Sequence, residues 1–285
     1  MPTVIKFPSI KALQTVIKGL SEIVDGCVFT FTPEGVRLVS LDISHVALCD
    51  LTLTFMTDSP KYIFDPAHDE ACINLRALSS VLTDVDRQSG TEELRWTIDM
   101  ATDSMCFDRF DGSLETFCDR WRLKTINIDN DERCTTNDIA DSTPSSRMVI
   151  SSKYFRTAIT SFDILDNPES ILFEVDYVSR KFTISSEGSQ GECSRVLSQQ
   201  QDTKRIDFVS GTDKILRAHF SLDYIKRFIK ASTVADTIEI TLTKVPNDSV
   251  VLLTIEYAVS DFGRMKFFVP SKVCGDDSDD DVMDQ

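Results

Sequence analysis

The stretch CVFTFTPEGVRLVSLDISHVALCDLTL, residues 27–53, is the part of the sequence that decides the fold. Apolar and polar residues alternate along it, and β-branched and aromatic side chains are frequent, which is typical of strands with one buried face. The segment Pro33-Glu34-Gly35 interrupts the alternation and predicts a tight turn. The stretch therefore predicts two antiparallel strands joined by this turn, followed by a third strand.

A second stretch, ILFEVDYVSRKFTISSEGSQGECSRVLS at residues 171–198, has the same layout. Apolar residues at helical spacing precede each stretch and recur after it, and nearly all remaining segments have strand or turn patterns. Corresponding helices begin about 140–150 residues apart, which indicates a duplicated domain because solenoid repeats are much shorter. The four helices are predicted at residues 9–24, at 75–85, from Ser151-Ser152 onward with Ser151 or Ser152 as the N-cap, and at 221–233.

A polar segment, NIDNDERCTTNDIADSTPSSR, separates the two similar halves and is typical of an interdomain connector. The last eleven residues, GDDSDDDVMDQ, hold six aspartates and no base, which predicts a solvated, disordered tail. We therefore expect an N-terminal domain at 1–127, a connector at 128–147, a C-terminal domain at 148–273 and the tail at 274–285.

The charge is unevenly distributed. The chain has 285 residues and a formal net charge of −16, which would repel DNA at long range. The four predicted helices nevertheless carry eight bases against four acids, and the bases share the polar faces of their helices. If the helices cover one side of the sheets, that side is electropositive and is suited to phosphate contacts. The eight bases are Lys11, Lys18, Arg76, Lys153, Arg156, Lys226, Arg227 and Lys230.

Motifs for catalysis, metals and membranes are missing from the sequence. The eight cysteines form no C-x-x-C pair, which favours reduced thiols and predicts no metal site. Asp42, Ser44 and His45 are the residue types of a catalytic triad, but neighbouring strand positions point to opposite faces and cannot align them. No phosphate-binding glycine motif and no membrane-length apolar segment occurs. We expect no enzyme activity, no cofactor and no membrane contact.

Three segments resemble a known family. GVRLVSLDISHVALCDLTL (35–53), FSLDYIKRFIKAST (220–233) and EYAVSDFGRMKFFVPSK (256–272) are similar to segments of proliferating cell nuclear antigen, the eukaryotic sliding DNA clamp. The family signature Ser/Leu-x-Asp-x-Ser-His-Val stands here as Leu41-Asp42-Ile43-Ser44-His45-Val46. The resemblance implies an α+β fold: two similar domains of the DNA-clamp type, each with two helices packed on antiparallel sheets, that assemble into a ring.

The resemblance also implies how such a ring works. Three subunits surround duplex DNA independently of its sequence, with the helices inside and a continuous sheet outside. The ring tethers DNA polymerase and repair proteins and is opened by a clamp loader. Partners insert a short peptide with a 3₁₀ turn into an apolar pocket, which is one recurring mode of peptide recognition. Carried over by position, the pocket comprises Leu41, His45, Val46, Ile139, Leu252, Phe268, Val269 and Pro270.

Subunits of the family pair their edge strands across the interface. The matching strands lie near residues 115–123 and 191–198, where Phe117, Trp121 and Val196 are available to fill the seam. Long unpaired edges would otherwise promote aggregation. The resemblance implies a homotrimer in the nucleus, or at a viral replication site if a virus encodes the chain.

Two alternatives remain open at this point. The chain could be one subunit of a mixed ring of the checkpoint-clamp type, or a monomeric processivity factor that holds DNA by charge alone. The second helix also offers only Arg76 as a base.

Overall fold

The structure is a computed structural model that carries side chains. It describes residues 3–7, 10–55, 62–66, 69–87, 92–99, 103–111, 116–126, 143–166, 168–199, 206–211, 214–246, 248–260 and 263–272. Most of the predicted connector, including Ile139, and the acidic tail lie outside these residues.

The N-terminal half contains two helices and nine strands among the described residues. The helices are α1 (Ile10–Ser21) and α2 (Leu75–Arg87). The strands are β1 (Val4–Phe7), β2 (Gly26–Thr32), β3 (Gly35–Leu41), β4 (Leu48–Thr54), β5 (Tyr62–Ile63), β6 (Glu70–Asn74), β7 (Glu92–Asp99), β8 (Ser104–Asp111) and β9 (Thr116–Lys124).

The C-terminal half repeats this order of elements. Its helices are α4 (Ser152–Thr160), continued by the 3₁₀ turn η3 (Ser161–Ile164), and α5 (Leu222–Phe228), continued by η4 (Ile229–Thr233). Its strands are β10 (Ser146–Ser151), β11 (Ser170–Asp176), β12 (Lys181–Gly188), β13 (Gly191–Ser198), β14 (Ile206–Gly211), β15 (Ile215–Ser221), β16 (Thr237–Lys244), β17 (Val251–Val259) and β18 (Gly263–Pro270).

The strands form three antiparallel sheets. The five-stranded sheet has the order β5-β1-β7-β8-β9, and the four-stranded sheet has the order β13-β12-β11-β15. The nine-stranded sheet, β14-β10-β16-β17-β18-β4-β3-β2-β6, contains strands from both halves, because β18 pairs with β4. One continuous sheet therefore joins the C-terminal half to the N-terminal half.

The strand order makes the duplication explicit. The row β5-β1-β7-β8-β9 of the N-terminal half corresponds to β14-β10-β16-β17-β18 of the C-terminal half, and β4-β3-β2-β6 corresponds to β13-β12-β11-β15. The buried positions of α1 and the α4–η3 segment are also equivalent: residues 10, 13, 16, 17 and 20 match residues 152, 155, 158, 159 and 162. Corresponding residues of these two helices are therefore 142 apart, as the sequence predicted.

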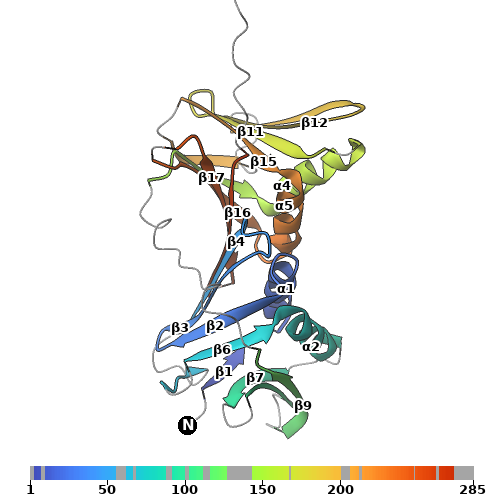
Figure 1. Cartoon of the computed structure of the whole chain (residues 1–285), viewed down its shortest axis with the longest axis vertical. Helices are drawn as coiled ribbons and strands as arrows, with labels where there is room; N and C mark the ends of the chain where they lie inside the picture. The colour runs from blue at the N-terminus through green and yellow to red at the C-terminus, as the bar shows by residue number, and fades with distance from the viewer. Residues whose placement is uncertain are drawn as a thin grey trace, which may run out of the picture.

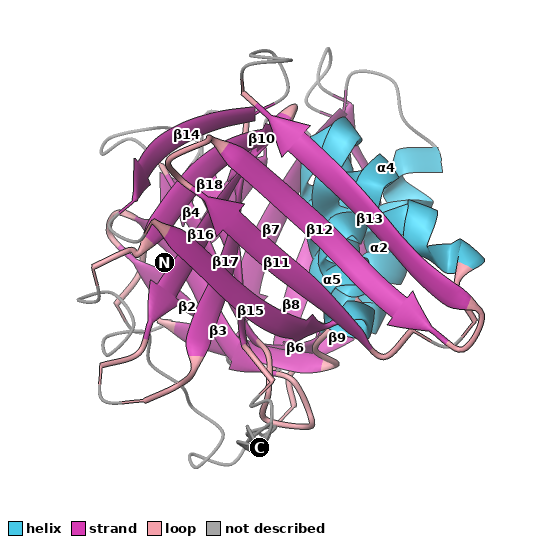
Figure 2. Cartoon of the chain, turned by 90° about the horizontal axis from the view of Figure 1, so that it is seen from above, coloured by secondary structure: helices cyan, strands magenta, loops and turns pink. Residues whose placement is uncertain are grey.

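The helices lie on one side of the molecule and the large sheet on the other, as both views show (Figures 1 and 2). The buried apolar side chains of the strands form a core together with those of the helices. In each half a phenylalanine of the strand after the first helix is central: Phe29 lies 5.7 Å from Trp96, and Phe173 lies 5.2 Å from Phe182, measured between ring centroids. All four rings are almost fully buried. Aromatic pairs at this spacing stabilise a core beyond the area that they bury.

The two halves also meet through their helices. A Cβ atom built on Gly19 of α1 would lie 2.9 Å from the Cβ of Ala231 in η4, so a larger residue at position 19 would force the helices apart. The Lys230 ammonium also lies 2.6 Å from the Glu22 carboxylate, which joins the halves on the helical side.

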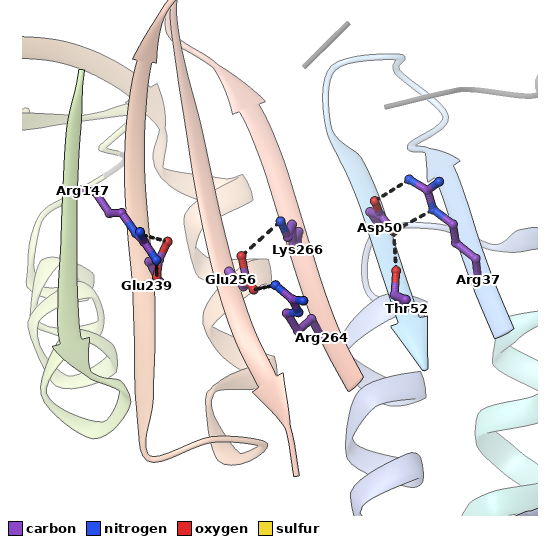
Figure 3. A network of polar contacts seen from close by, with 8 residues as sticks. All are labelled: Arg37, Asp50, Thr52, Arg147, Glu239, Glu256, Arg264 and Lys266. Carbon is purple, nitrogen blue, oxygen red and sulfur yellow. Dashed lines mark hydrogen bonds and ion pairs between the residues drawn. The ribbon is translucent and has the colours of Figure 1, made fainter. Parts of the chain in front are cut away.

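Part of the opposite face of the large sheet carries a network of paired charges (Figure 3). Arg147 binds Glu239 at 2.6 Å, Glu256 lies 3.2 Å from Lys266 and 3.7 Å from Arg264, and Asp50 lies 3.0 Å from Arg37. The residues come from β10, β16, β17, β18, β4 and β3, and thus from both halves. Each acid of this network is held by at least one base.

The boundaries differ from the sequence predictions in several places. Helix α1 ends at Ser21, before the predicted end at residue 24, and α2 extends to Arg87, beyond the predicted end at residue 85. Strand β10 begins at Ser146, so the last two residues of the predicted connector belong to the C-terminal half. The predicted helix at 221–233 changes from α to 3₁₀ geometry at Ile229. A tightened last turn is common because it satisfies carbonyls that lack a partner at the helix end.

Six described cysteines have free thiols. Burial raises the pKa of the Cys27 and Cys49 thiols well above the ordinary value. Within the described ranges no group of three or more His, Cys, Asp or Glu side chains is arranged to hold a metal ion. No helix in the same ranges is long and apolar enough to cross a membrane.

Candidate functional site

All eight predicted DNA-contacting bases lie on the helical side of the molecule. Lys11 and Lys18 are on α1, Arg76 is on α2, and Lys153 and Arg156 are on α4. The remaining three are Lys226 and Arg227 on α5 and Lys230 on η4. The helices thus bring together bases that are as far as 219 positions apart in the sequence.

The bases of α1 and α4 have no ion-pair partner within the described part of the chain. Lys11, Lys18 and Lys153 are exposed, and Arg156 is half-buried. Lys11 and Lys153 occupy equivalent positions of the repeat, because each follows the first residue of its helix. An ammonium group without an acidic neighbour is available to a phosphate at no cost in broken ion pairs.

The predicted DNA-contacting bases of the other two helices are paired. Lys226 binds Asp163 of η3, Arg227 binds Asp223 one turn earlier at 2.7 Å, and Lys230 binds Glu22 at 2.6 Å. Arg76 likewise lies 2.7 Å from Asp25. A phosphate must compete with these acids, so the four paired bases offer less attraction to DNA than their number indicates.

The loop at residues 42–47, which joins β3 to β4, carries the family signature and is organised by one buried carboxylate. Asp42 is only 3% exposed. Its Oδ1 accepts hydrogen bonds from the backbone N–H groups of Val46 and Ala47, both at 2.7 Å. Its Oδ2 accepts from the Ser44 N–H at 3.2 Å and from the Tyr224 hydroxyl at 2.6 Å. Tyr224 belongs to α5, so this loop is fixed by the other half of the chain.

The hydrogen bonds keep Asp42 ionised. Burial alone would raise the pKa of this carboxyl, but the bonds from Tyr224, Ala47, Val46 and Ser44 outweigh burial and lower the pKa below its usual value. Burial raises the pKa of Tyr224, and the neighbouring carboxylate raises it further, so the phenol remains a proton donor.

The loop presents the side chains of residues 43–46 to solvent, while Ala47 is buried. His45 has a φ of 55°, in the left-handed region that residues other than glycine seldom adopt. Val46 is 39% exposed and Ile43 is 91% exposed. The backbone turn that Asp42 closes therefore places a histidine and two aliphatic side chains at the surface.

Next to the loop, strand pairing gathers apolar side chains on the face of the sheet that points away from the helices. Leu41 pairs with Leu48, Leu48 pairs with Phe268, and Pro270 pairs with Leu252. Directly paired residues share a face, as do residues two apart in a strand. These five residues therefore form a continuous row across β3, β4, β18 and β17, which we call the outer apolar row.

The structure corrects the prediction for Val269. Adjacent residues of a strand point to opposite faces, so Val269 lies on the helical face when Phe268 and Pro270 lie on the outer face. Val269 is 1% exposed and packs in the core. Its side chain therefore cannot line a pocket on the outer face. Ile139, the predicted contribution of the connector, lies outside the described residues.

A hollow of about 730 Å³ lies beside the loop. Leu41, Asp42 and His45 line it together with Val28 and Val39 of neighbouring strands. Phe268, Leu252 and Pro270 are not among its described lining residues, so the hollow and the outer apolar row are neighbouring features that share Leu41.

The predicted interface strands are the free edges of their sheets. Strand β9 ends the five-stranded sheet and β13 ends the four-stranded sheet, and neither has a second neighbour in the described part of the chain. Phe117 is 51% exposed and Val196 is 53% exposed, while Trp121 is partly buried against the core. Exposed apolar side chains on unpaired edge strands are a frequent feature of protein–protein contact surfaces.

Two site residues were missed from the sequence. Leu48 joins the outer apolar row only through strand register, which the sequence pattern does not fix. Tyr224 reaches Asp42 across 182 positions, so no local signal could pair them. The one sequence signal for a role of Tyr224 was its position on the partly polar face of the last predicted helix.

Comparisons with known proteins agree with this architecture. A family model described as "Proliferating cell nuclear antigen, C-terminal domain" matches residues 138–272. Proliferating cell nuclear antigen of Chaetomium thermophilum is 25% identical over 272 residues, covering 93% of this chain and 95% of that protein. The crystal structure of proliferating cellular nuclear antigen from Entamoeba histolytica has a TM-score of 0.75 at 19% identity, covering 95% of this chain and 98% of the other.

The duplicated α+β fold, with its helices on one side and antiparallel sheets on the other, is the fold of the DNA clamps. The agreement extends over both halves of the chain, and the sequence matches point the same way. The chain belongs to the proliferating cell nuclear antigen family.

Proposed function

We propose that this chain is a sliding clamp, in which three copies close head-to-tail into a ring around duplex DNA. The ring tethers DNA polymerase and repair proteins to DNA, a clamp loader opens it, and it performs no chemistry of its own. The ring acts in the nucleus, or at a viral replication site if a virus encodes the chain. Membership of the family supports the clamp function, and the geometry of this chain supports the particulars that follow.

The observation that carries the proposal is that the two free edge strands, β9 and β13, are the repeat equivalents of the two strands that join the halves inside the chain. Within the chain, β18 pairs with β4. By the repeat, β9 is the equivalent of β18 and β13 is the equivalent of β4, and these two strands are the unpaired edges. Pairing β9 of one copy with β13 of the next would repeat the internal junction between subunits, and a heterologous contact of this kind closes into a ring when its rotation permits.

The helical side supports the placement of DNA. If the internal junction recurs between copies, the helices of every copy lie on the same side of the continuous sheet. The unpaired bases Lys11, Lys18, Lys153 and Arg156 then face the enclosed duplex and contact phosphates without selecting a sequence. The outer face, with its paired charges, adds little repulsion or attraction along the network of Figure 3.

The partner site is proposed at the outer apolar row and the adjoining loop. Leu41, Leu252, Phe268 and Pro270 supply the apolar surface, and His45 and Val46 border it. A short peptide with a 3₁₀ turn would bury its apolar anchors there, in the manner of isolated hot spots. Phe268→Ala should weaken such a peptide by about tenfold, because truncating a buried aromatic anchor typically costs that much.

The mass of the pure chain in solution tests the assembly. Light scattering during size exclusion should give three times the mass of 32.1 kDa at micromolar concentration. A single chain at every concentration would contradict the homotrimer and favour a mixed ring or a monomeric factor.

Two single substitutions, one on each edge strand, test the proposed interface. Phe117→Asp and Val196→Asp, made in separate proteins, should each yield monomers because a buried unpaired carboxylate would sit in the seam. Ile164→Asp is the matched control, since Ile164 is 73% exposed and lies on neither edge strand. Trimers of either edge variant would remove β9 and β13 from the proposed interface.

A further inference from the structure

The contact between Asp42 and Tyr224 joins the two surfaces on which the proposed function depends. Asp42 belongs to the loop beside the outer apolar row, and Tyr224 belongs to α5, whose next residues along the helix carry the paired bases. We propose that Tyr224 is a positioning residue for the partner-binding loop, so that the helix of the C-terminal half fixes the conformation in which the N-terminal half presents His45 and Val46. This inference rests on the proposed function and deepens it, since it names what controls the partner site.

The loop has few other contacts. Beyond the bonds to the Asp42 carboxylate, the Asp42 N–H donates to the Ala47 carbonyl at 2.8 Å and the His45 N–H donates to the Asp42 carbonyl at 2.9 Å. The Ser44 side chain also hydrogen-bonds to Tyr224, and the Ala47 side chain is buried in the core. The left-handed conformation of His45 costs free energy that the surrounding bonds must offset. The Asp42 carboxylate accepts three of the loop's backbone N–H groups, so its position strongly affects the shape of the loop.

Tyr224 decides the position of that carboxylate. The side chain of Asp42 can rotate about two bonds, and its Oδ2 receives the Tyr224 hydroxyl at 2.6 Å, which is the short distance of a charge-assisted hydrogen bond. The backbone bonds to Val46, Ala47 and Ser44 come from the loop that is being positioned, so they cannot fix it relative to the rest of the protein. Among the described hydrogen bonds of the carboxylate, the Tyr224 hydroxyl is the donor from outside the loop.

Tyr224 is in turn held by its own helix. Its ring lies 6.3 Å from the ring of Phe228, which stacks on Phe267 of β18 at 4.8 Å with an interplanar angle of 7°. Arg227 lies over the Tyr224 ring at 5.6 Å and also lines the hollow beside the loop. A chain of packed aromatic rings thus connects the loop to α5 and to the strand that forms the internal junction.

The inference has a direct test in Tyr224→Phe, which removes the hydroxyl and keeps the ring. Tyr62→Phe is the matched control. The Tyr62 hydroxyl lies 2.6 Å from the Thr32 carbonyl and 3.0 Å from the Gly35 carbonyl, at the opposite end of β3 from the loop. Both variants lose one tyrosine hydroxyl that bonds to a hairpin of the same sheet, but only Tyr224→Phe releases Asp42.

The first measurement is amide hydrogen exchange across residues 42–47 in the full-length protein without any ligand. In Tyr224→Phe the amides of Ser44, Val46 and Ala47 should exchange about tenfold faster, the size expected when a hydrogen bond to a charged group is lost. In Tyr62→Phe they should exchange at the wild-type rate. Unchanged exchange in Tyr224→Phe, or equal acceleration in both variants, would overturn the inference.

The second measurement is binding of a fluorescent synthetic peptide that contains one 3₁₀ turn with apolar anchors. Tyr224→Phe should weaken this peptide by about tenfold while leaving the mass of the assembly unchanged, and Tyr62→Phe should bind like wild type. Equal affinity in all three proteins would overturn the positioning role. If the wild type itself fails to bind the peptide, the proposed partner site is wrong, and the exchange measurement still decides whether Tyr224 positions the loop.

Discussion

The helices α1 and α4 and the helices α2 and α5 hold corresponding places in a duplicated chain, yet they differ in the state of their bases. On α1 and α4, Lys11 and Lys153 are equivalent residues without acidic partners in the described structure. On α5 and η4 every predicted DNA-contacting base has a carboxylate within ion-pair distance. The positive surface available to DNA is therefore carried by one helix of each half, although the sequence distributes bases over all four.

This difference between paired and unpaired bases shows that the number of bases on a protein surface overestimates the attraction of that surface for phosphates. The acids that neutralise the bases of α5 and η4 come from η3, from α5 itself and from the residue that follows α1. Exposed ion pairs contribute about 0–1 kcal/mol each, so they are weak enough to break but still compete with DNA. The account predicts an order of effects among substitutions on the two sets of helices.

The largest effect is expected from Lys11→Glu combined with Lys153→Glu. The exchange removes two unpaired cations per subunit and places anions against the duplex. Affinity for a short duplex, measured by fluorescence anisotropy at low salt, should fall by more than about tenfold, and the dependence on salt should become shallower by about 0.9 per lost phosphate contact. Lys181→Glu with Lys214→Glu changes the net charge equally away from the helices and should bind DNA nearly as the wild type does.

A smaller effect is expected from Lys226→Glu combined with Lys230→Glu. These bases are already engaged by Asp163 and Glu22, so their loss removes less attraction from the helical side. Affinity should fall by about threefold in the same assay, with the assembly mass unchanged. A loss as large as that of the α1 and α4 variant would show that the ion pairs do not limit DNA contact.

Removing the acids that compete with phosphate should change the affinity for DNA in the opposite direction. Glu22→Gln with Asp163→Asn frees Lys230 and Lys226 while preserving side-chain shape. Affinity for the duplex should rise by about twofold to fivefold, and the salt dependence should steepen as additional phosphate contacts form. Asp207→Asn with Glu187→Gln, which removes the same charge from strands, serves as the control. No gain over this control would contradict the proposed competition.

The smallest effect is expected on α2, where the repeat places Ser80 at the position of Arg227. Ser80 is exposed, so Ser80→Lys adds a base without disturbing the core. The duplex should bind about twofold more tightly, since one exposed cation adds a single screened contact. Unchanged binding would indicate that this part of α2 faces away from DNA.

The sequence predicted those features that depend on local periodicity. The apolar spacing of residues 10, 13, 16, 17 and 20 predicted α1 and its buried face, and the same spacing 142 positions later revealed the duplication. The exposure of Lys11, Lys18 and Lys153 followed from the same pattern. The fold class, which the family resemblance implied, was confirmed, and the alternating strands and the repeated order of elements agree with it.

Features that depend on contacts between distant segments could not be predicted. The ion pair of Lys230 with Glu22 spans 208 positions, and the bond of Tyr224 to Asp42 spans 182. Strand register decided that Leu48 joins the outer apolar row, and strand alternation placed Val269 in the core although its neighbours lie outside. A motif fixes which residues are near in the chain, whereas pairing and register decide which side chains share a surface.

Retention on circular and linear DNA tests most directly whether the helical side encloses the duplex. The chain is assembled on a nicked circular plasmid by its loader, isolated by gel filtration, and then divided into samples with and without cutting by a restriction enzyme at one salt concentration. The account predicts that the protein stays on the closed circle and leaves the cut molecule through its free ends. Equal loss from both forms, with a steep dependence on salt, would contradict a closed ring and indicate a protein that holds DNA by charge alone.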